Sequence, residues 1–184
     1  MDREYYDDDN NEIDFNEVRS DEMVGITIQS WEFGFLLLYP TNSFIYSCYS
    51  DFYKQRAIAK LVYNCHSSEI EAEACALSLL NHRFLIKYLD IIFLADYKIF
   101  FFPYYTEGDL FDFITRKYYY DNEPITEKFL ARFFFLIASG LSYMHNNGFV
   151  HRDIKPENIL LNREQRLDGS FGYYPVIIDF GNTI

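Results

Sequence analysis

The first half of the chain alternates short apolar stretches with turn-forming residues. Aromatic and β-branched side chains, which favour strands, are dense in "WEFGFLLLYP" (31–40), "SFIYSCYS" (43–50) and "RAIAKLVY" (56–63). The polar and proline-containing residues between them predict turns. "RFLIKYLDIIFLADYKIFFFPYY" (83–105) predicts two further strands around a turn near Ala95-Asp96-Tyr97. This half is therefore expected to contain an antiparallel sheet.

A period close to 3.6 residues predicts three helices. Residues 68–80 place Glu73, Ala76, Leu77 and Leu80 on one face. Residues 108–120 read as a second helix, and residues 125–147 as a long third one that ends before Gly148. The apolar positions expected to form the buried stripe of the third helix are Leu130, Phe133, Phe134, Ile137, Leu141 and Met144. A polar loop and a short buried strand, "VIID" (176–179), follow.

Composition and charge restrict the class of protein. Apolar residues make up 49% of the 184 residues, enough for a packed core. Cys48, Cys65 and Cys75 form no CxxC pair and are expected to be free thiols in a reducing compartment. No basic leader and no run of about 18 apolar residues is present, so we expect an intracellular protein, cytoplasmic or nuclear, without a membrane partner.

The net charge of −12 argues against a general nucleic-acid-binding surface. Residues 1–22 carry ten acids against two arginines, and so account for −8 of it. The segment 1–23 is therefore expected to be an acidic, disordered tail.

The segment "HRDIKPENIL" (151–160) carries the chemistry. It places Asp153, Lys155 and Asn158 on one tight loop after an apolar pair and before a strand. A carboxylate can orient a hydroxyl proton, an ammonium can neutralise a transferring phosphate, and an amide oxygen can hold a divalent ion.

These residues resemble the catalytic loop of eukaryotic protein kinases, H-R-D-x-K-x-x-N, and the Lys155-Pro156-Glu157-Asn158 version is similar to the serine/threonine branch. Asp179-Phe180-Gly181 resembles the magnesium-binding D-F-G of that family. The resemblance implies Mg²⁺ bound by Asn158 and Asp179, with ATP as the phosphoryl donor. The 21 residues from Asn158 to Asp179 exceed the spacing expected for the family, and a polar hairpin tip around Asp168-Gly169 accounts for the excess.

Further positions match the family upstream. "RAIAK" resembles the V-A-I-K strand, which implies that Lys60 holds the α- and β-phosphates. Its glutamate partner is expected on the helix 68–80: Glu73 lies on the apolar stripe and is the chosen residue, Glu69 is the reserve, and Glu71 falls off the stripe.

"FFFPYYTEGDLFDFI" resembles the kinase hinge. The resemblance implies Phe102 as gatekeeper and Pro103 to Tyr105 as the backbone that contacts adenine. Asp109 is then the acid that contacts the ribose.

Two departures from the family bear on activity. Where a glycine-rich loop is expected, "PTNSFIYS" has Pro40, Asn42 and Ile45 in place of glycines, although glycine permits the close backbone approach that phosphates need. After Gly181 only three residues remain, so the resemblance implies a kinase domain truncated after D-F-G. The long third helix would then expose an apolar face.

The expected fold is α+β and kinase-like, with two lobes. A β-rich N-lobe with one helix (24–102) precedes a hinge (103–108) and an incomplete, mainly helical C-lobe (109–184).

The expected function is that of a serine/threonine protein kinase that binds Mg-ATP and transfers the γ-phosphate to a protein hydroxyl, with a protein substrate or a partner kinase. The alternative is a catalytically impaired, truncated module that regulates or competes with an active kinase. A small-molecule phosphotransferase is disfavoured by Arg152 and the Lys155-Pro156 pair.

Overall fold

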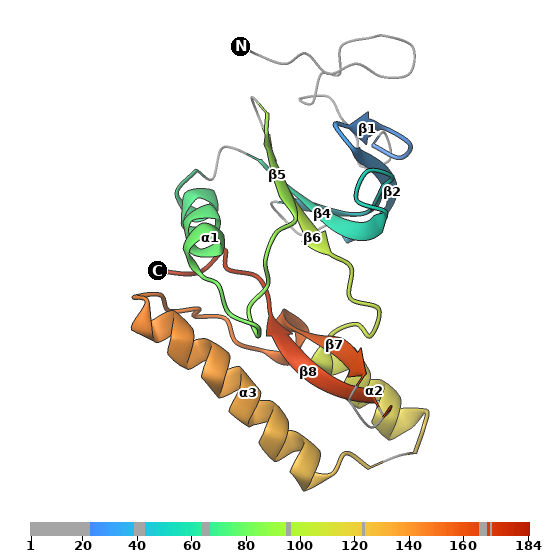
Figure 1. Ribbon diagram of the computed structural model, residues 1–184, viewed down its shortest axis with the longest axis vertical. Helices are drawn as coiled ribbons and strands as arrows, with labels where there is room; N and C mark the ends of the chain where they lie inside the picture. Colours follow the sequence, from blue (N-terminus) through green and yellow to red (C-terminus); the bar gives the residue numbers. More distant parts are fainter. Residues whose placement is uncertain are drawn as a thin grey trace. The chain divides into compact units, whose positions relative to one another are not determined.

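The computed structural model describes residues 23–38, 43–63, 67–94, 97–122, 124–165, 169 and 171–184, with the backbone alone for 67–71 (Figure 1). The fold is α+β, and the described residues form two compact units. The first contains the residues up to Ser67 together with Tyr88–Tyr104, and the second contains Ser68–Lys87 and Tyr105–Ile184. The tail at 1–22 and the residues at 39–42 lie outside the described part. The lobe boundaries expected from the sequence stay a prediction.

The first unit is built on a six-stranded antiparallel sheet with the strand order β1-β2-β3-β4-β6-β5 (Figure 1). Its strands are β1 (Thr27–Ile28), β2 (Trp31–Leu38), β3 (Ser43–Ser50), β4 (Gln55–Tyr63), β5 (Asp90–Phe93) and β6 (Tyr97–Pro103). The five strands predicted from the sequence are confirmed. The two-residue β1, which pairs Thr27 with Glu32 and Ile28 with Trp31, was not predicted.

Aromatic side chains form the core of the sheet. Trp31 is fully buried and stacks between Tyr53 and Phe101, with ring centroids 5.3 and 4.7 Å away. Its indole nitrogen donates a hydrogen bond of 3.1 Å to Asp90 Oδ2, which satisfies the buried polar atom of the ring. Full burial of one such side chain contributes roughly 1.5–3 kcal/mol or more.

The second unit contains the helices and a hairpin. Its elements are α1 (Ser67–Leu79), α2 (Leu110–Tyr119), α3 (Glu127–Asn146), the 3-10 turn η2 (Pro156–Asn158), β7 (Ile159–Gln165) and β8 (Phe171–Ile177). The predicted stripe of α1 is confirmed, because Glu73, Ala76, Leu77 and Leu80 are all buried.

The prediction for the long helix α3 is confirmed in its bounds but wrong at one position. Phe133, Ile137 and Met144 are buried, whereas Phe134 is 64% exposed. Gly140, rather than Phe134, completes the buried face, and a Cβ at this glycine would lie 3.2 Å from Ile177 Cδ1. Gly148 follows the helix at φ +82°, a left-handed conformation that commonly ends helices at glycine.

The polar stretch after the catalytic-type loop, expected as a loop with a hairpin tip around Asp168-Gly169, is a hairpin whose strands are longer than expected. β7 and β8 pair in an unbroken antiparallel register from Ile159–Ile177 to Gln165–Phe171. Backbone pairing does not require apolar side chains, so a polar strand at a solvated edge leaves a weak sequence signal. The predicted turn residue Asp168 lies outside the described residues, while Gly169 has a φ of +79°.

Two of the cysteines can be placed. Cys48 is a buried free thiol and Cys75 an exposed one, and burial raises the pKa of Cys48 to about 12, so its thiol stays protonated. Cys65 lies outside the described residues. No helix within the described ranges is long and apolar enough to cross a membrane.

Candidate active site

The candidate catalytic loop lies between α3 and β7 and is anchored by His151. This side chain is 1% exposed, and its Nε2 lies 2.9 Å from the carbonyl oxygen of Ile178. Its ring also meets the edge of Phe180 at 5.5 Å. The loop and the D-F-G segment are therefore held together through the histidine, within one unit.

Asp153, Lys155 and Asn158 converge as predicted. Lys155 Nζ donates to Asp153 Oδ2 at 2.8 Å, and Asn158 Nδ2 donates to the same oxygen at 3.0 Å. Asn158 Nδ2 also donates to the backbone carbonyl of Asp153 at 2.9 Å. Both side-chain donors thus bind Oδ2 rather than Oδ1.

These contacts adjust the ionisation of the pair. The hydrogen bond from Lys155 is the main cause that lowers the pKa of Asp153 below its ordinary value. The same bond raises the pKa of Lys155. Near neutral pH Asp153 is a carboxylate and Lys155 an ammonium, which are the protonation states that phosphoryl transfer requires.

Asn158 is hydrogen-bonded to the residue that precedes Asp179. Ile178 N donates to the carbonyl oxygen of Asn158 at 3.0 Å, so the residue before Asp179 is tied to the predicted metal ligand. Asp179 has a φ of +64°, an uncommon conformation for a residue with a side chain that often marks functional sites.

The donor set fits a hard divalent cation. Because the amide nitrogen of Asn158 is the donor toward Asp153, its amide oxygen remains for an acceptor role. A carboxylate and an amide oxygen are ligands that Mg²⁺ accepts, with water and phosphate completing the octahedron. Among the described residues, no group of three or more His, Cys, Asp and Glu side chains gathers as a metal site, so a site at this point would depend on such additional ligands.

Glu73 of α1 reaches the same neighbourhood. A Cβ built on Gly181 would lie 3.5 Å from Asp179 Oδ1 and 4.0 Å from Glu73 Oε2. Glu73 is only 4% exposed, and a buried carboxylate needs a partner to offset its desolvation. Lys60 lies on β4, between Ile45 of β3 and Phe100 of β6. Lys60 and Glu73 belong to different units, and their pairing stays a prediction.

The residues after D-F-G return to the catalytic loop, which the sequence did not reveal. Val150 and Ile184 exchange two backbone hydrogen bonds of 2.9 and 3.2 Å, and Arg152 Nε donates to the carbonyl oxygen of Asn182. Arg152 itself has a φ of +66°. The "HRD" pattern was the available signal for Arg152, but no local pattern indicates the pairing partner of Val150.

The residues predicted to form the hinge have the following positions in the structure. Phe102 is buried and pairs with Ile58, and Pro103 pairs with Ala57 at the end of β6. Burial raises the pKa of the Tyr105 hydroxyl to about 12, so it remains protonated. Asp109 is the N-cap of α2.

The Oδ1 atom of Asp109 accepts a 2.8 Å hydrogen bond from Asp112 N. Burial is the main cause that raises the pKa of Asp109. Its predicted contact with ribose is a separate role and stays untested.

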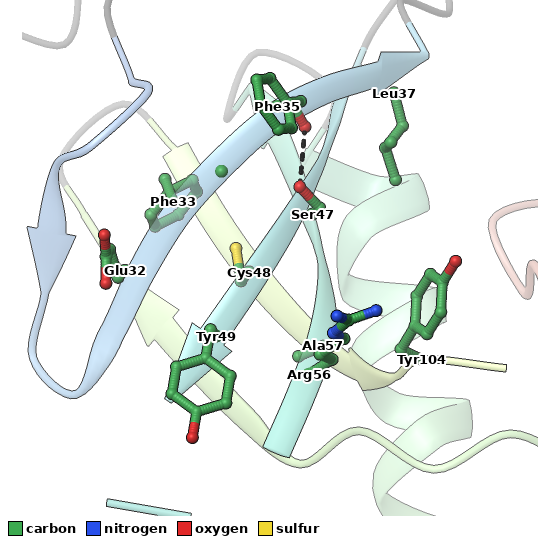
Figure 2. A pocket seen from close by; sticks show the side chains of 11 residues that line it. Glu32, Phe33, Phe35, Leu37, Ser47, Cys48, Tyr49, Arg56, Ala57 and Tyr104 are labelled. Carbon is green, nitrogen blue, oxygen red and sulfur yellow. Dashed lines mark hydrogen bonds between the residues drawn. The ribbon is translucent and has the colours of Figure 1, made fainter. Parts of the chain in front are cut away.

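The first unit also contains a hollow of about 440 Å³. Figure 2 shows its lining side chains on β2, β3 and β4 together with Tyr104, which follows β6, and the 3.3 Å hydrogen bond from Ser47 Oγ to the Phe35 carbonyl. Of the predicted site residues, neither Lys60 nor Pro103 lines this hollow. Ile45, one of the three positions that replace glycines, lies in strand β3, where it pairs with Leu38 of β2 and Lys60 of β4. The other two positions lie outside the described residues.

Comparisons with known proteins agree with this geometry. Residues 41–183 match the protein kinase domain family. The chain is 36% identical over 112 residues to the "Probable serine/threonine-protein kinase KIN1 homolog" of Enterocytozoon bieneusi, covering 61% of this chain and 17% of that protein. It is 39% identical over 106 residues to calcium-dependent protein kinase 4 of Plasmodium falciparum, covering 57% and 18%.

A yeast protein gives a match of similar extent. The carbon catabolite-derepressing protein kinase of Saccharomyces cerevisiae is 35% identical over 116 residues, which cover 62% of this chain and 17% of that kinase. In each of these matches the aligned segment covers less than a fifth of the relative's length. The family match covers well over half of this chain, and we conclude that the chain belongs to the protein kinase domain family, of the serine/threonine type by homology.

Proposed function

We propose that the protein binds Mg-ATP and transfers its γ-phosphate to a serine or threonine hydroxyl of a protein substrate. The observation that carries the proposal is the convergence of Lys155 and Asn158 on one oxygen of Asp153. With Oδ2 occupied by these donors, Oδ1 is the oxygen that can accept the proton of a substrate hydroxyl. General-base assistance of this kind contributes roughly 10²–10⁴ in rate.

The other residues take the roles that the family pattern assigns. Bound Mg-ATP supplies the phosphoryl group, and the cation neutralises its charge. Asn158 and Asp179 hold the cation, and Lys155 steadies the γ-phosphate. Lys60, paired with Glu73, holds the α- and β-phosphates. The backbone from Pro103 to Tyr105 contacts adenine, and Asp109 contacts the ribose. In this proposal the six-stranded unit corresponds to the β-rich lobe of a bilobal kinase fold, and the helical unit to the other lobe.

Nucleotide binding and transfer are tested separately. For wild type, we expect a Mg-ATP-dependent rise in melting temperature that EDTA abolishes. Lys60→Met and Asp179→Asn should remove this rise, while Lys54→Met, a change at an exposed lysine paired with Asp51, should retain it.

Asp153→Asn should retain binding but lose transfer of radiolabelled phosphate to a generic protein substrate, such as casein, by roughly 10²-fold or more. A wild-type chain that gives no shift with Mg-ATP, or a Lys60→Met variant that behaves as wild type does, would contradict the proposal.

The alternative function is that of an impaired kinase-like module that regulates or competes with an active kinase. Two observations favour it: a strand residue, Ile45, replaces a glycine, and Phe134 and Phe135 of α3 are 64% and 71% exposed. Added to an active serine/threonine kinase, the chain should then change that kinase's rate equally with and without Lys60→Met. Loss of the effect in this variant would favour the catalytic reading.

A further inference from the structure

The β7–β8 hairpin continues well beyond the part that follows the catalytic loop. Its inner half, Ile159–Leu161 with Pro175–Ile177, is mostly buried. Its outer half, residues 162–165 paired with 171–174, is more exposed. The β7 residues of this half are polar, and its β8 residues are aromatic apart from Gly172. We call this outer half the hairpin extension. It carries side chains that contact two other segments of the same unit.

One face of the extension, which carries Asn162 and Glu164 of β7 and Tyr174 of β8, holds the segment that follows α1. The Arg83 guanidinium lies over the ring of Tyr174, 4.7 Å from its centroid, and its Nη2 donates to Glu164 Oε2. The hydroxyl of Tyr174 accepts a 2.6 Å hydrogen bond from Asn162 Nδ2, which fixes the ring. Phe84 packs at 6.3 Å from the same ring.

Backbone hydrogen bonds extend the contact between the segment after α1 and the hairpin toward the buried end of β8. Ile177 N donates to the Phe84 carbonyl and Ile86 N donates to the Ile177 carbonyl, both at 2.9 Å. Leu85 and Ile177 form a parallel bridge. Residues 84–86 thus pair with Ile177 of β8 through a single parallel bridge, and Arg83 is held just before them.

The opposite face of the extension, which carries Arg163 of β7 and Tyr173 of β8, contacts α2 and the segment before it. Arg163 Nη1 lies 4.0 Å from Glu107 Oε1, and the ring of Tyr173 lies 5.3 Å from that of Phe113 in α2. Leu161 N donates to the Gly108 carbonyl at 2.9 Å. The hairpin is therefore bound along both of its edges.

We propose that the hairpin extension is a brace, and that Arg83, Glu164 and Tyr174 are positioning residues for the candidate active site. The segment 83–86 continues from the helix that carries Glu73, and the segment 105–109 carries two of the residues assigned to the nucleotide. By fixing both segments against β7 and β8, the brace holds these residues in register with the catalytic loop. The functional part of the inference rests on the proposed function, whereas the mechanical part does not.

One exposed ion pair would be too weak to hold residues 84–86 against β8, because such pairs contribute little to stability on their own. Arg83 is held by a carboxylate and an aromatic face at once, and a planar guanidinium stacks on the ring while it binds the carboxylate, which a lysine ammonium does less well. The brace therefore depends on the combination, and its loss is expected to open residues 84–86 locally rather than to unfold the chain.

Amide hydrogen exchange in the absence of nucleotide tests the mechanical part. In the double variant Glu164→Gln/Tyr174→Leu, exchange at residues 84–86 should accelerate about tenfold, with little change in the peptides of β3 and β4. Arg83→Lys should give a smaller acceleration, and the charge exchange Arg83→Glu/Glu164→Arg should slow exchange again relative to Arg83→Glu alone. Lys54→Gln, which removes an exposed ion pair in the other unit, is the matched control and should change nothing at 84–86.

Mg-ATP titration of the same variants tests the functional part. The dissociation constant should rise about fivefold in the double variant, while the urea midpoint, read from β-sheet signals, stays near that of wild type. Unchanged exchange at 84–86 overturns the brace. Accelerated exchange with unchanged nucleotide affinity overturns the positioning role. If wild type does not bind Mg-ATP, the proposed function fails, and the exchange result alone decides whether the brace exists.

Discussion

At the scale of single residues, the ionisation of Asp153 is the property on which the proposed chemistry depends. The pKa of this carboxyl is lowered chiefly by the hydrogen bond from Lys155. In Lys155→Met that donor is lost, so the pKa of Asp153 should rise toward the ordinary aspartate value. Carboxyl ¹³C NMR titration of both proteins measures this change.

The direction of the coupled stability effect follows from the same shift. A carboxyl whose pKa is lower in the folded state stabilises the fold above its unfolded value of about 3.9, and this stabilisation is lost as the pH falls through the folded value. In Lys155→Met, the free energy of unfolding should therefore depend less on pH in the acid range. Identical Asp153 titrations in the two proteins would contradict the assigned contact.

His82 provides a second pH-dependent contact, in the segment after α1. Burial lowers its pKa, its ring stacks on Tyr143 at 5.0 Å, and Phe84 N donates to its Nδ1 at 3.3 Å. Protonation removes that acceptor. Because the unfolded state binds the proton more readily, stability should fall as the pH drops below about 6.5 and level off below the folded pKa.

Chemical denaturation between pH 7.5 and 5 measures this loss. His82→Asn keeps an acceptor atom but cannot titrate, so it serves as the control, and the difference between its curve and that of wild type isolates His82. If the free energy of unfolding changes with pH in the same way in wild type and His82→Asn, protonation of His82 does not contribute to the loss of stability.

At the scale of elements, Asp109 tests whether a predicted ligand also has a structural role. Its Oδ1 caps α2 by accepting from Asp112 N, and loss of such a cap costs about 1 kcal/mol. Asp109→Ala should lower the free energy of unfolding by this amount, measured by urea denaturation. Asp109→Asn retains a cap acceptor and should stay close to wild type.

The same pair of variants separates capping from nucleotide contact. A ribose contact through the carboxylate should weaken in both variants, whereas the stability loss should occur in Asp109→Ala alone. Equal destabilisation by the two changes would mean that the charge of Asp109, rather than its acceptor atom, supports α2.

Elements with a strong local signal were predictable from the sequence. The stripe of α1 was predictable because Ala76, Leu77 and Leu80 recur at helical spacing, and Glu73 shares their face. The strands β2, β3 and β4 follow from dense aromatic and β-branched residues between turns. The convergence of Asp153, Lys155 and Asn158 was predictable, because the pattern H-R-D-x-K-x-x-N places these residue types at fixed spacing on one loop.

Features that depend on distant partners were not predictable. The pairing of Val150 with Ile184 joins positions 34 residues apart. No sequence pattern around either residue indicates that the other is its partner. Residues 162–165 are polar, and their strand is stabilised by pairing with residues 171–174 and by contacts with Arg83 and Glu107 from other parts of the chain. Phe134 was assigned to the buried stripe because its spacing fits. The buried face instead passes through Phe133 and Gly140, and Gly140 packs against Ile177.

At the scale of the whole molecule, the exposed aromatic face of α3 should govern association. Phe134 and Phe135 are 64% and 71% exposed, whereas their neighbour Phe133 is 3% exposed. Exposed apolar side chains in adjacent positions promote self-association. Phe134→Gln/Phe135→Gln should therefore reduce aggregation, measured by light scattering against concentration, and leave the free energy of unfolding nearly unchanged.

The matched control lies one residue away on the same helix. Phe133→Ala removes a ring that stacks 5.1 Å from Phe129 inside the unit, and loss of a buried phenylalanine costs roughly 3–5 kcal/mol. This variant should unfold at a lower urea concentration and aggregate more than wild type. If the Phe134/Phe135 variant loses as much stability as Phe133→Ala does, the two rings are packed in solution. The face would then be covered rather than exposed, and the argument for association through it would fail.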